Sequence, residues 1–403
     1  MKLPLLAEPL RHRDFRLLWA GQGVSMFGNF VHGVALPFQF FALGATAVQI
    51  GAGFALLTAS QLVLLLFGGA IVDRVPRRRV ILASDLVSGI VATAVGALSL
   101  TGSLRTEHLY FELAVFGGAA AFFMPAIGAI IPELVPGEIL TQGNALRGLS
   151  RQFARVAGPA TGGLIVVSVG PGWAFLFDGL TFFLSFAALL ATRPPTAEAR
   201  DHKHILREIR EGIAFTFSVP WLWITIAIFA LYNTAFSGPI SVGIPLFIRD
   251  VLGADAQLFG LSLAAVGLGE FAGGIFVAQA GLRRIGIAMY VYSIVGGLAI
   301  AGVGLVPSIP TLFAFAVTTG VCLAGFGTLW ETAVQRNVPR ELLGRVGSVD
   351  WFGSFLLGPV APVLAGIVIQ SYGTVPLFIG AGAMAAALGC VGVLVPSIRA
   401  LRA

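Results

Sequence analysis

Long apolar runs dominate this sequence and restrict the folds that are open to it. Twelve runs of about 20 to 27 residues can be counted, and each is long enough to cross a hydrocarbon core of roughly 30 Å as a helix. Only 11% of the residues are charged and 57% are hydrophobic, whereas about a quarter of the residues in soluble domains are charged. The sequence therefore predicts an all-α membrane protein with twelve transmembrane helices.

The expected spans form two sets of six. The first set covers 15–43, 47–72, 80–104, 109–134, 144–169 and 172–191, and the second covers 221–248, 256–280, 285–306, 311–335, 346–369 and 374–395. The polar stretch between them carries apolar residues at helical spacing: Leu206, Ile209, Ile213 and Phe217. We therefore expect a six-helix bundle at 1–192, a cytoplasmic linker with an amphipathic helix at 193–219, and a second six-helix bundle at 220–403.

The basic residues give the expected orientation. If both termini are cytoplasmic, about 21 of the 25 Lys and Arg residues fall in cytoplasmic segments, which is the asymmetry of the positive-inside rule. The high pI of about 9.9 then follows from membrane topology. Nucleic-acid binding is not expected, because the cations are scattered over short loops without a soluble domain to hold them.

The two sets of spans resemble copies of each other. Val135-Pro136 is echoed by Val338-Pro339 at a separation of 203 residues, and Gly158-Pro159 is echoed by Gly358-Pro359 at a separation of 200 residues. An internal repeat of this kind is typical of secondary transporters, whose binding site lies between the repeats at mid-membrane depth.

Several short stretches, taken in order along the chain, resemble the major facilitator superfamily. They are Phe15–Trp19 with Ser25 and Gly28, the loop Gly69–Arg79, Pro132–Pro136 leading into Asn144-Ala145, Gly158-Pro159 with Gly162-Gly163, and Leu343–Val346. In detail they resemble the bacterial drug:proton antiporters of the macrolide-efflux and enterobactin-exporter branch. The resemblance implies two pseudo-symmetric six-helix bundles, alternating access, and a monomer in the bacterial inner membrane that exports an amphipathic molecule against proton entry.

A cytoplasmic gate is expected around the loop between the second and third spans. A carboxylate there can accept hydrogen bonds from amides at a helix start and can pair with an arginine. The resemblance implies that Arg345 is the partner from the other bundle, while anchoring of the loop by its arginines is the alternative. The expected gate residues are Gly69, Asp73, Arg74, Arg77, Arg78 and Arg345.

A second expected motif lies in the fifth span and consists of Gly158, Pro159, Gly162 and Gly163. Proline bends a helix, and glycines four apart let another helix come close. The resemblance implies that this region seals the central cavity against proton leak. Helix packing alone is the alternative.

Charges inside the spans are few, and each costs roughly 2.5 to 3.5 kcal/mol at the bilayer centre, so they usually pair or face a cavity. Glu270 is the first choice for a proton carrier, followed by Asp178 or Glu112. Arg155 is a candidate counter-charge or contact for an anionic substrate, and His32 can titrate. For each, a hydrogen-bonded packing role is the alternative.

Aromatic side chains and a methionine on the inner helices suit a large amphipathic substrate such as a drug, siderophore or metabolite. The cavity candidates are Phe40, Phe122, Phe123, Met124, Phe229 and Trp330. A nutrient importer of the same fold and a non-transporting receptor are the alternatives. An enzyme is not expected, because no Walker loop or zinc-protease motif occurs. Neither a cofactor nor a metal is expected, and Cys322 and Cys390 lie in apolar spans.

Overall fold

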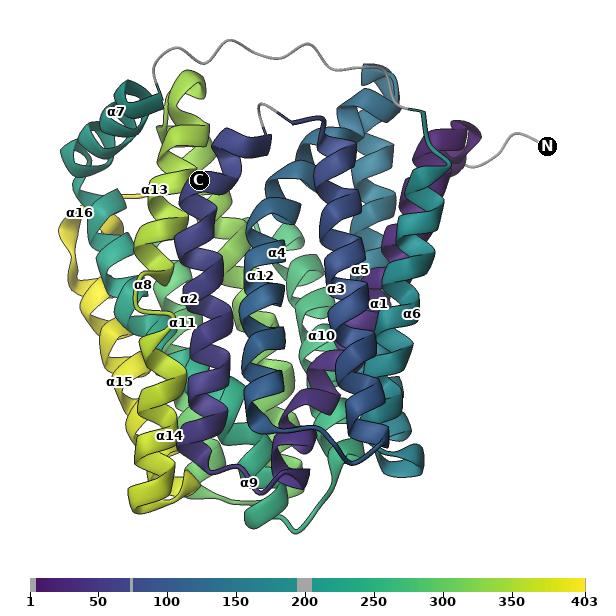
Figure 1. Ribbon diagram of the computed structural model, residues 1–403. Coiled ribbons are helices and arrows are strands. Elements are labelled where there is room, and N and C mark those ends of the chain that lie inside the picture. The colour runs from purple at the N-terminus through teal and green to yellow at the C-terminus, as the bar shows by residue number, and fades with distance from the viewer. Residues whose placement is uncertain (1–4, 73–74, 194–204, 403) are drawn as a thin grey trace. The chain divides into compact units, whose positions relative to one another are not determined.

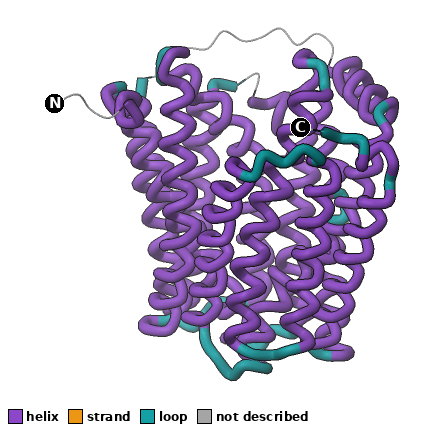
Figure 2. The backbone as a smooth tube through the Cα atoms, turned by 180° about the vertical axis from the view of Figure 1, so that it is seen from behind, coloured by secondary structure: helices purple, strands orange, loops and turns teal. Residues whose placement is uncertain are grey.

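The computed structural model describes residues 5–72, 75–193 and 205–402. Within these ranges the chain forms helices joined by short loops, without a strand (Figures 1 and 2). A helix satisfies its backbone hydrogen bonds internally, which is what an apolar chain requires in lipid. The all-helical prediction is confirmed.

The first half contains six long helices. They are α1 (Arg13–Ala42), α2 (Ala47–Val72), α3 (Arg77–Leu100), α4 (Thr106–Leu134), α5 (Leu140–Val169) and α6 (Pro171–Leu190), with short 3-10 turns at Leu5–Arg11 and Gly137–Ile139. Helices α5 and α6 are separated by Gly170 alone, whose φ of 92° ends the first helix. Pro171 then occupies the first position of α6, where its missing N–H costs nothing.

The second half begins with α7 (Ile205–Ser218), a helix that lies within the range expected for the linker. It continues with α8 (Pro220–Gly238), a π-helical segment (Pro239–Gly243), α9 (Ile244–Asp250), α10 (Ala256–Gln279), α11 (Ile285–Leu305), α12 (Ile309–Asn337), α13 (Leu343–Phe355), α14 (Val360–Tyr372), α15 (Thr374–Leu394) and α16 (Pro396–Arg399).

Ten helical stretches of the described chain are long and apolar enough to cross a membrane. They correspond to ten of the twelve expected spans. The other two expected spans are α1 and α5, which carry the charged residues Arg13, Asp14 and Arg16, and Arg147, Arg151 and Arg155. Each of these two helices has 30 residues.

Two expected spans are not single regular helices. The span expected at 346–369 is interrupted between Phe355 and Val360, where Gly358 N–H donates to the Phe355 carbonyl at 2.8 Å in a tight turn. Pro359 has no N–H to continue the ladder, so a new helix begins after it. The span expected at 221–248 contains the π-helical segment Pro239–Gly243.

The described chain divides into two compact units. The first consists of residues 1–45, 56–201 and 255–264, and the second of 46–55, 202–254 and 265–403. In the first unit α1 packs against α5 and α6, and α3 packs against α4 and α6. In the second, α11 packs against α12 and α15, and α8 packs against α13 to α15. The division assigns α7 to the second unit, and each unit also contains the first turns of one helix from the other half.

Candidate functional site

Three ionisable side chains meet in the interior of the first unit. His32 of α1 lies between Asp178 of α6 and Glu112 of α4, with its Nδ1 at 3.0 Å from an Asp178 carboxylate oxygen and its Nε2 at 3.9 Å from Glu112. The exposed fractions are 5% for His32 and 0% for both acids. Three of the five expected proton-coupling candidates therefore form one buried cluster, which we call the His32 cluster.

The two acids of the His32 cluster differ in their hydrogen bonds. Asp178 contacts His32 and also accepts a long hydrogen bond of 3.4 Å from the Thr181 hydroxyl. Neither carboxyl oxygen of Glu112 has a hydrogen-bond partner within the described residues. The rings of Phe116 and Phe175 lie with their centroids 4.9 Å from the His32 ring.

A buried carboxylate without a donor is costly, whereas a protonated carboxyl is far less so. The His32 cluster thus has one satisfied acid, one unsatisfied acid and an imidazole between them. Such an arrangement can hold protons and release them when its surroundings change.

Gly28 brings the cluster together. A Cβ at this position of α1 would lie 2.6 Å from the nearer Asp178 carboxyl oxygen and would also collide with the Thr181 hydroxyl. The close approach of α1 and α6 at this level therefore requires glycine. Gly28 was singled out in the sequence only through the family resemblance.

A second buried polar cluster was not identified from the sequence. Gln22 of α1 donates to Asp85 of α3 at 3.2 Å and to the Ser185 hydroxyl of α6 at 2.8 Å, and Ser185 donates to Asp85 at 2.8 Å. Polar residues at 22, 25, 32 and 39 recur on one face of α1. This spacing was the available signal that α1 carries a polar face toward α3 and α6.

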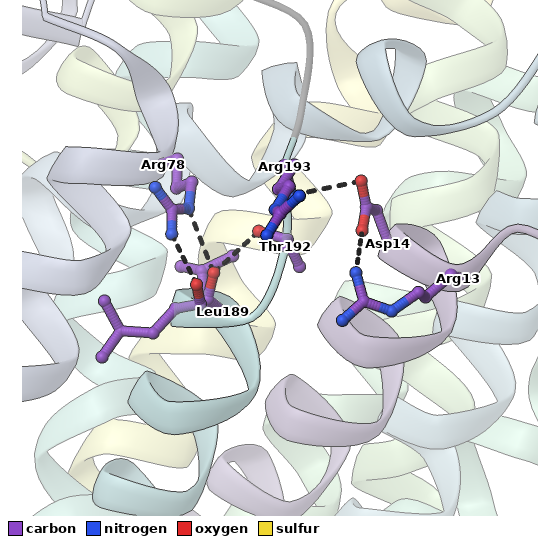
Figure 3. A network of polar contacts seen from close by, with 7 residues as sticks. Arg13, Asp14, Arg78, Leu189, Thr192 and Arg193 are labelled. Carbon is purple, nitrogen blue, oxygen red and sulfur yellow. Dashed lines mark hydrogen bonds and ion pairs between the residues drawn. The ribbon is translucent and has the colours of Figure 1, made fainter.

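The arginines at the start of α3 have separate partners. Arg77 pairs with Glu133 near the end of α4. Arg78 donates to the carbonyls of Leu189 and Leu190 at 3.1 and 2.8 Å, at the C-terminal end of α6 (Figure 3). A cation there satisfies carbonyls that have no partner in the helix and favours the negative end of its dipole.

The same end of α6 connects to α1. The Arg193 backbone N–H donates to Asp14 at 3.2 Å, and Asp14 lies 3.7 Å from Arg13 (Figure 3). Of the other gate candidates, Gly69 belongs to α2, and Asp73 and Arg74 lie outside the described residues. The gate involving Asp73 therefore stays a prediction.

Arg345, the expected partner of Asp73, contacts the linker helix in the second unit. Its Nη1 donates to Glu211 of α7 at 2.5 Å. A Cβ added to Gly212 would lie 3.0 Å from the Arg345 Cβ, so α7 packs closely on the start of α13. Ile213 and Phe217 of α7 are 42% and 65% exposed, which is typical of a helix whose apolar edge lies in a membrane interface.

The fifth-helix motif packs α5 against two neighbours within the first unit. A Cβ on Gly158 would lie 2.6 Å from the Phe30 Cβ of α1, and one on Gly163 would lie 2.6 Å from the Ala256 carbonyl of α10. Gly162 likewise allows α1 to approach. A Cβ on Gly260 of α10 would collide with the Pro159 carbonyl.

The second unit contains a contact like that between α5 and α10. A Cβ on Gly366 of α14 would lie 2.5 Å from the Ala47 carbonyl of α2, and one on Gly51 of α2 would collide with the Pro362 carbonyl. Pro362 and Gly366 follow Pro159 and Gly163 by 203 residues, the same separation as the Val-Pro repeat. The expected echo of Pro159 in Pro359 is thus wrong, because Pro359 precedes the start of α14 whereas Pro362 makes the equivalent contact.

The remaining charged candidates lie outside the His32 cluster. Glu270 is half-buried in α10 and belongs to the second unit, whereas the cluster belongs to the first. A Cβ on Gly320 of α12 would lie 2.6 Å from the Glu270 backbone nitrogen, so α10 and α12 are closely packed there. The Arg155 guanidinium lies 6.0 Å from the centroid of the Phe30 ring, within cation–π range.

The cavity candidates occupy different environments. Phe40 is fully buried, Phe122 and Phe123 pack against the core of the first unit, and Met124 is 54% exposed. Phe229 belongs to an aromatic cluster of the second unit and stacks on Phe326 with centroids 4.0 Å apart.

Trp330 continues that aromatic cluster. Its ring stacks on Phe326 and its indole N–H donates to Asp350 at 2.8 Å. Asp350 also accepts from the Ser354 hydroxyl at 3.0 Å. Aromatic rings and the Asp350 carboxylate thus form a partly buried cluster beside the interrupted helix of the second unit.

Comparisons with known proteins agree with this architecture. A sequence model described as the Major Facilitator Superfamily matches residues 18–362. The chain is 27% identical to the enterobactin exporter EntS of Citrobacter koseri over 374 residues, which cover 89% of this chain and 88% of EntS. It is 26% identical to the multidrug efflux pump Tap of Mycolicibacterium fortuitum over 391 residues, which cover 93% of each chain. A crystal structure of a variant of the nucleoside transporter NupG matches with a TM-score of 0.77 at 12% identity, covering 96% and 98% of the two chains, which shows a shared fold.

Proposed function

Because the chain belongs to the Major Facilitator Superfamily, whose members are transporters and not enzymes, we propose that it exports a small amphipathic molecule in exchange for protons. It is a multi-pass protein of the cell membrane. The direction of transport is proposed from the relatives: EntS is an exporter and Tap is an efflux pump, and both align over most of their length.

We propose that α1 and α5 complete a set of twelve spans, with both termini in the cytoplasm. Each of the two helices has 30 residues, which corresponds to about 45 Å of helix and exceeds the hydrocarbon core. Polar residues of α1 such as Gln22 and His32 are buried within the first unit, so they do not prevent its insertion. Alternating access by two six-helix bundles, working as a monomer, is the expected mechanism.

The observation that carries the proposal of proton coupling is the His32 cluster. It joins α1, α4 and α6, so a change in its protonation changes the attraction among three helices of the first unit. When His32 is protonated and both acids are ionised, the cluster is a charged triad in an apolar interior. Binding one more proton leaves a neutral ion pair of His32 with Asp178.

Glu112 is therefore the proposed proton carrier, with His32 and Asp178 as its partners. Glu270 and Arg155 keep secondary roles: Glu270 as an alternative carrier in the second unit and Arg155 as a contact for an anionic group. The cytoplasmic gate around Asp73 and the seal formed by Gly158, Pro159, Gly162 and Gly163 control access from the two sides.

The proposed substrate is amphipathic because the second unit contains a cluster of partly buried aromatic rings. Phe229, Phe326 and Trp330 stack in sequence, and the indole N–H of Trp330 is held by Asp350. Stacked rings bind flat apolar groups, and a carboxylate beside them can accept a hydrogen bond from a polar group.

The experiment that tests direction starts with a resistance screen on a strain that overproduces the chain. Compounds that the strain tolerates are then offered to right-side-out and everted membrane vesicles energised by respiration. An exporter accumulates the compound in everted vesicles and not in right-side-out vesicles. Energised accumulation in right-side-out vesicles alone would identify an importer and contradict the proposal.

A further inference from the structure

A groove on the first unit is not used by the transport proposal, although Phe122, one of the expected cavity residues, lines it. It lies between α2, α3 and α4, encloses about 730 Å³, and is lined almost entirely by apolar side chains. Figure 1 shows α4 between α2 and α3, and α3 and α4 supply most of the residues that line the groove. A volume of this size is typical of ligand sites. We call it the α2–α4 groove.

Small residues leave the space of the groove open, and larger residues border it. Ala83 of α3 and Ala114, Gly118 and Ala119 of α4 leave the space, while Phe111 is 63% exposed at its edge. Phe111 and Phe122 lie three turns apart on α4, so the groove runs roughly 16 Å along the helix axis. The exposed apolar side chains along the groove, such as Phe111, suit contact with lipid chains.

One cation lies at one end of the groove. Arg79 lines it and is exposed, while Arg77 is paired with Glu133 and Arg78 with carbonyls of α6. Within residues 5–72, 75–193 and 205–402, the Arg79 side chain makes no hydrogen bond or ion pair. The first turn of α3 adds the positive end of a helix dipole at the same place.

We propose that the α2–α4 groove binds an anionic phospholipid, with an acyl chain along α3 and α4 and the phosphate on Arg79. The length of the groove matches an acyl chain, and Arg79, the cation among its lining residues, matches a single phosphate. The distribution of basic residues places this end of α3 in the cytoplasmic leaflet, where anionic lipids are enriched. The inference does not depend on the direction of transport or on the substrate.

Two substitutions separate the headgroup contact from the chain contact. Arg79→Gln removes the charge, and Ala83→Leu fills the groove from an exposed position that leaves the core intact. Arg283→Gln is the matched control for charge, because Arg283 is an exposed cation at the corresponding loop of the second half. Ala94→Leu is the control for volume, because Ala94 is exposed on α3 outside the groove.

The assay is native mass spectrometry of the purified full chain with equal amounts of dioleoyl phosphatidylglycerol and dioleoyl phosphatidylcholine. We expect the wild type to retain phosphatidylglycerol about fivefold over phosphatidylcholine, the ratio that one arginine near a membrane surface provides. Arg79→Gln should abolish the preference, and Ala83→Leu should reduce retention of both lipids.

Three outcomes would overturn the proposal. Arg283→Gln could lower the preference as much as Arg79→Gln, which would indicate a nonspecific charge effect. Ala83→Leu could behave like Ala94→Leu, which would place the retained lipid elsewhere. Soluble glycerol 3-phosphate could displace the lipid completely, which would identify a site for a free anion.

Discussion

The substitution Gly28→Ala tests the geometry on which the His32 cluster depends. The new Cβ would lie 2.6 Å from an Asp178 carboxyl oxygen and would collide with Thr181, so α6 must shift or the Asp178 side chain must rotate away from His32. Overpacking of this kind costs about 1 to 3 kcal/mol. Loss of the 3.0 Å contact between His32 and Asp178 adds about 1.5 to 3 kcal/mol if one partner is charged. We therefore expect the free energy of unfolding to fall by about 2.5 to 6 kcal/mol.

The assay is unfolding of the purified chain by SDS titration in mixed micelles. Gly33→Ala is the matched control, because Gly33 lies on the same helix and a Cβ there meets nothing within 4 Å. It should be neutral or stabilising by about 0.5 to 1 kcal/mol. The double variant Gly28→Ala with Thr181→Ala should recover part of the loss, since the nearest obstacle is gone. Equal stability of Gly28→Ala and Gly33→Ala would refute the proposed contact between α1 and α6.

Three further predictions concern other contacts. Gly163→Leu should destabilise the chain by about 1 to 3 kcal/mol in the same SDS titration. Gly148→Leu, on the open side of α5, should be nearly neutral. Equal effects of the two substitutions would contradict the close contact of α5 with α10. Glu211→Gln should raise the hydrogen-exchange rate of α7 while lowering overall stability by less than about 1 kcal/mol, because the ion pair is partly exposed; unchanged exchange would argue against the contact. Asp73→Asn should impair turnover in vesicles while leaving substrate binding largely intact, and loss of binding alone would contradict its role as a gate.

The helices could be predicted well because their signal is the length and hydrophobicity of each run. The interruptions of the helices could not be predicted, because the dipeptide Gly-Pro occurs both within a continuous helix and at a break between two helices. Gly158-Pro159 stays within the continuous helix α5, whereas Gly358-Pro359 falls between α13 and α14. The difference depends on packing: Pro159 lies where α1 and α10 press on α5, and neighbouring helices can hold a proline-containing helix together.

The three members of the His32 cluster could be singled out from the sequence, but their grouping could not be predicted. His32, Glu112 and Asp178 were each identified as rare polar groups in apolar spans. Which of them meet depends on the rotation of α1, α4 and α6 about their axes, and hydrophobicity in a membrane gives little information on rotation. The first choice, Glu270, was selected for its depth in the sequence of its span, and it lies in the second unit, outside the His32 cluster.

The central claim is that the His32 cluster carries the coupled proton. Its most direct test is the dissipation of a proton gradient in everted vesicles when an exported compound is added. Glu112→Gln should abolish compound-dependent proton movement, while Glu107→Gln, an exposed acid at the start of the same helix, should leave it unchanged. Normal coupling in Glu112→Gln together with its loss in Glu270→Gln would contradict the account and move the proton site to the second unit.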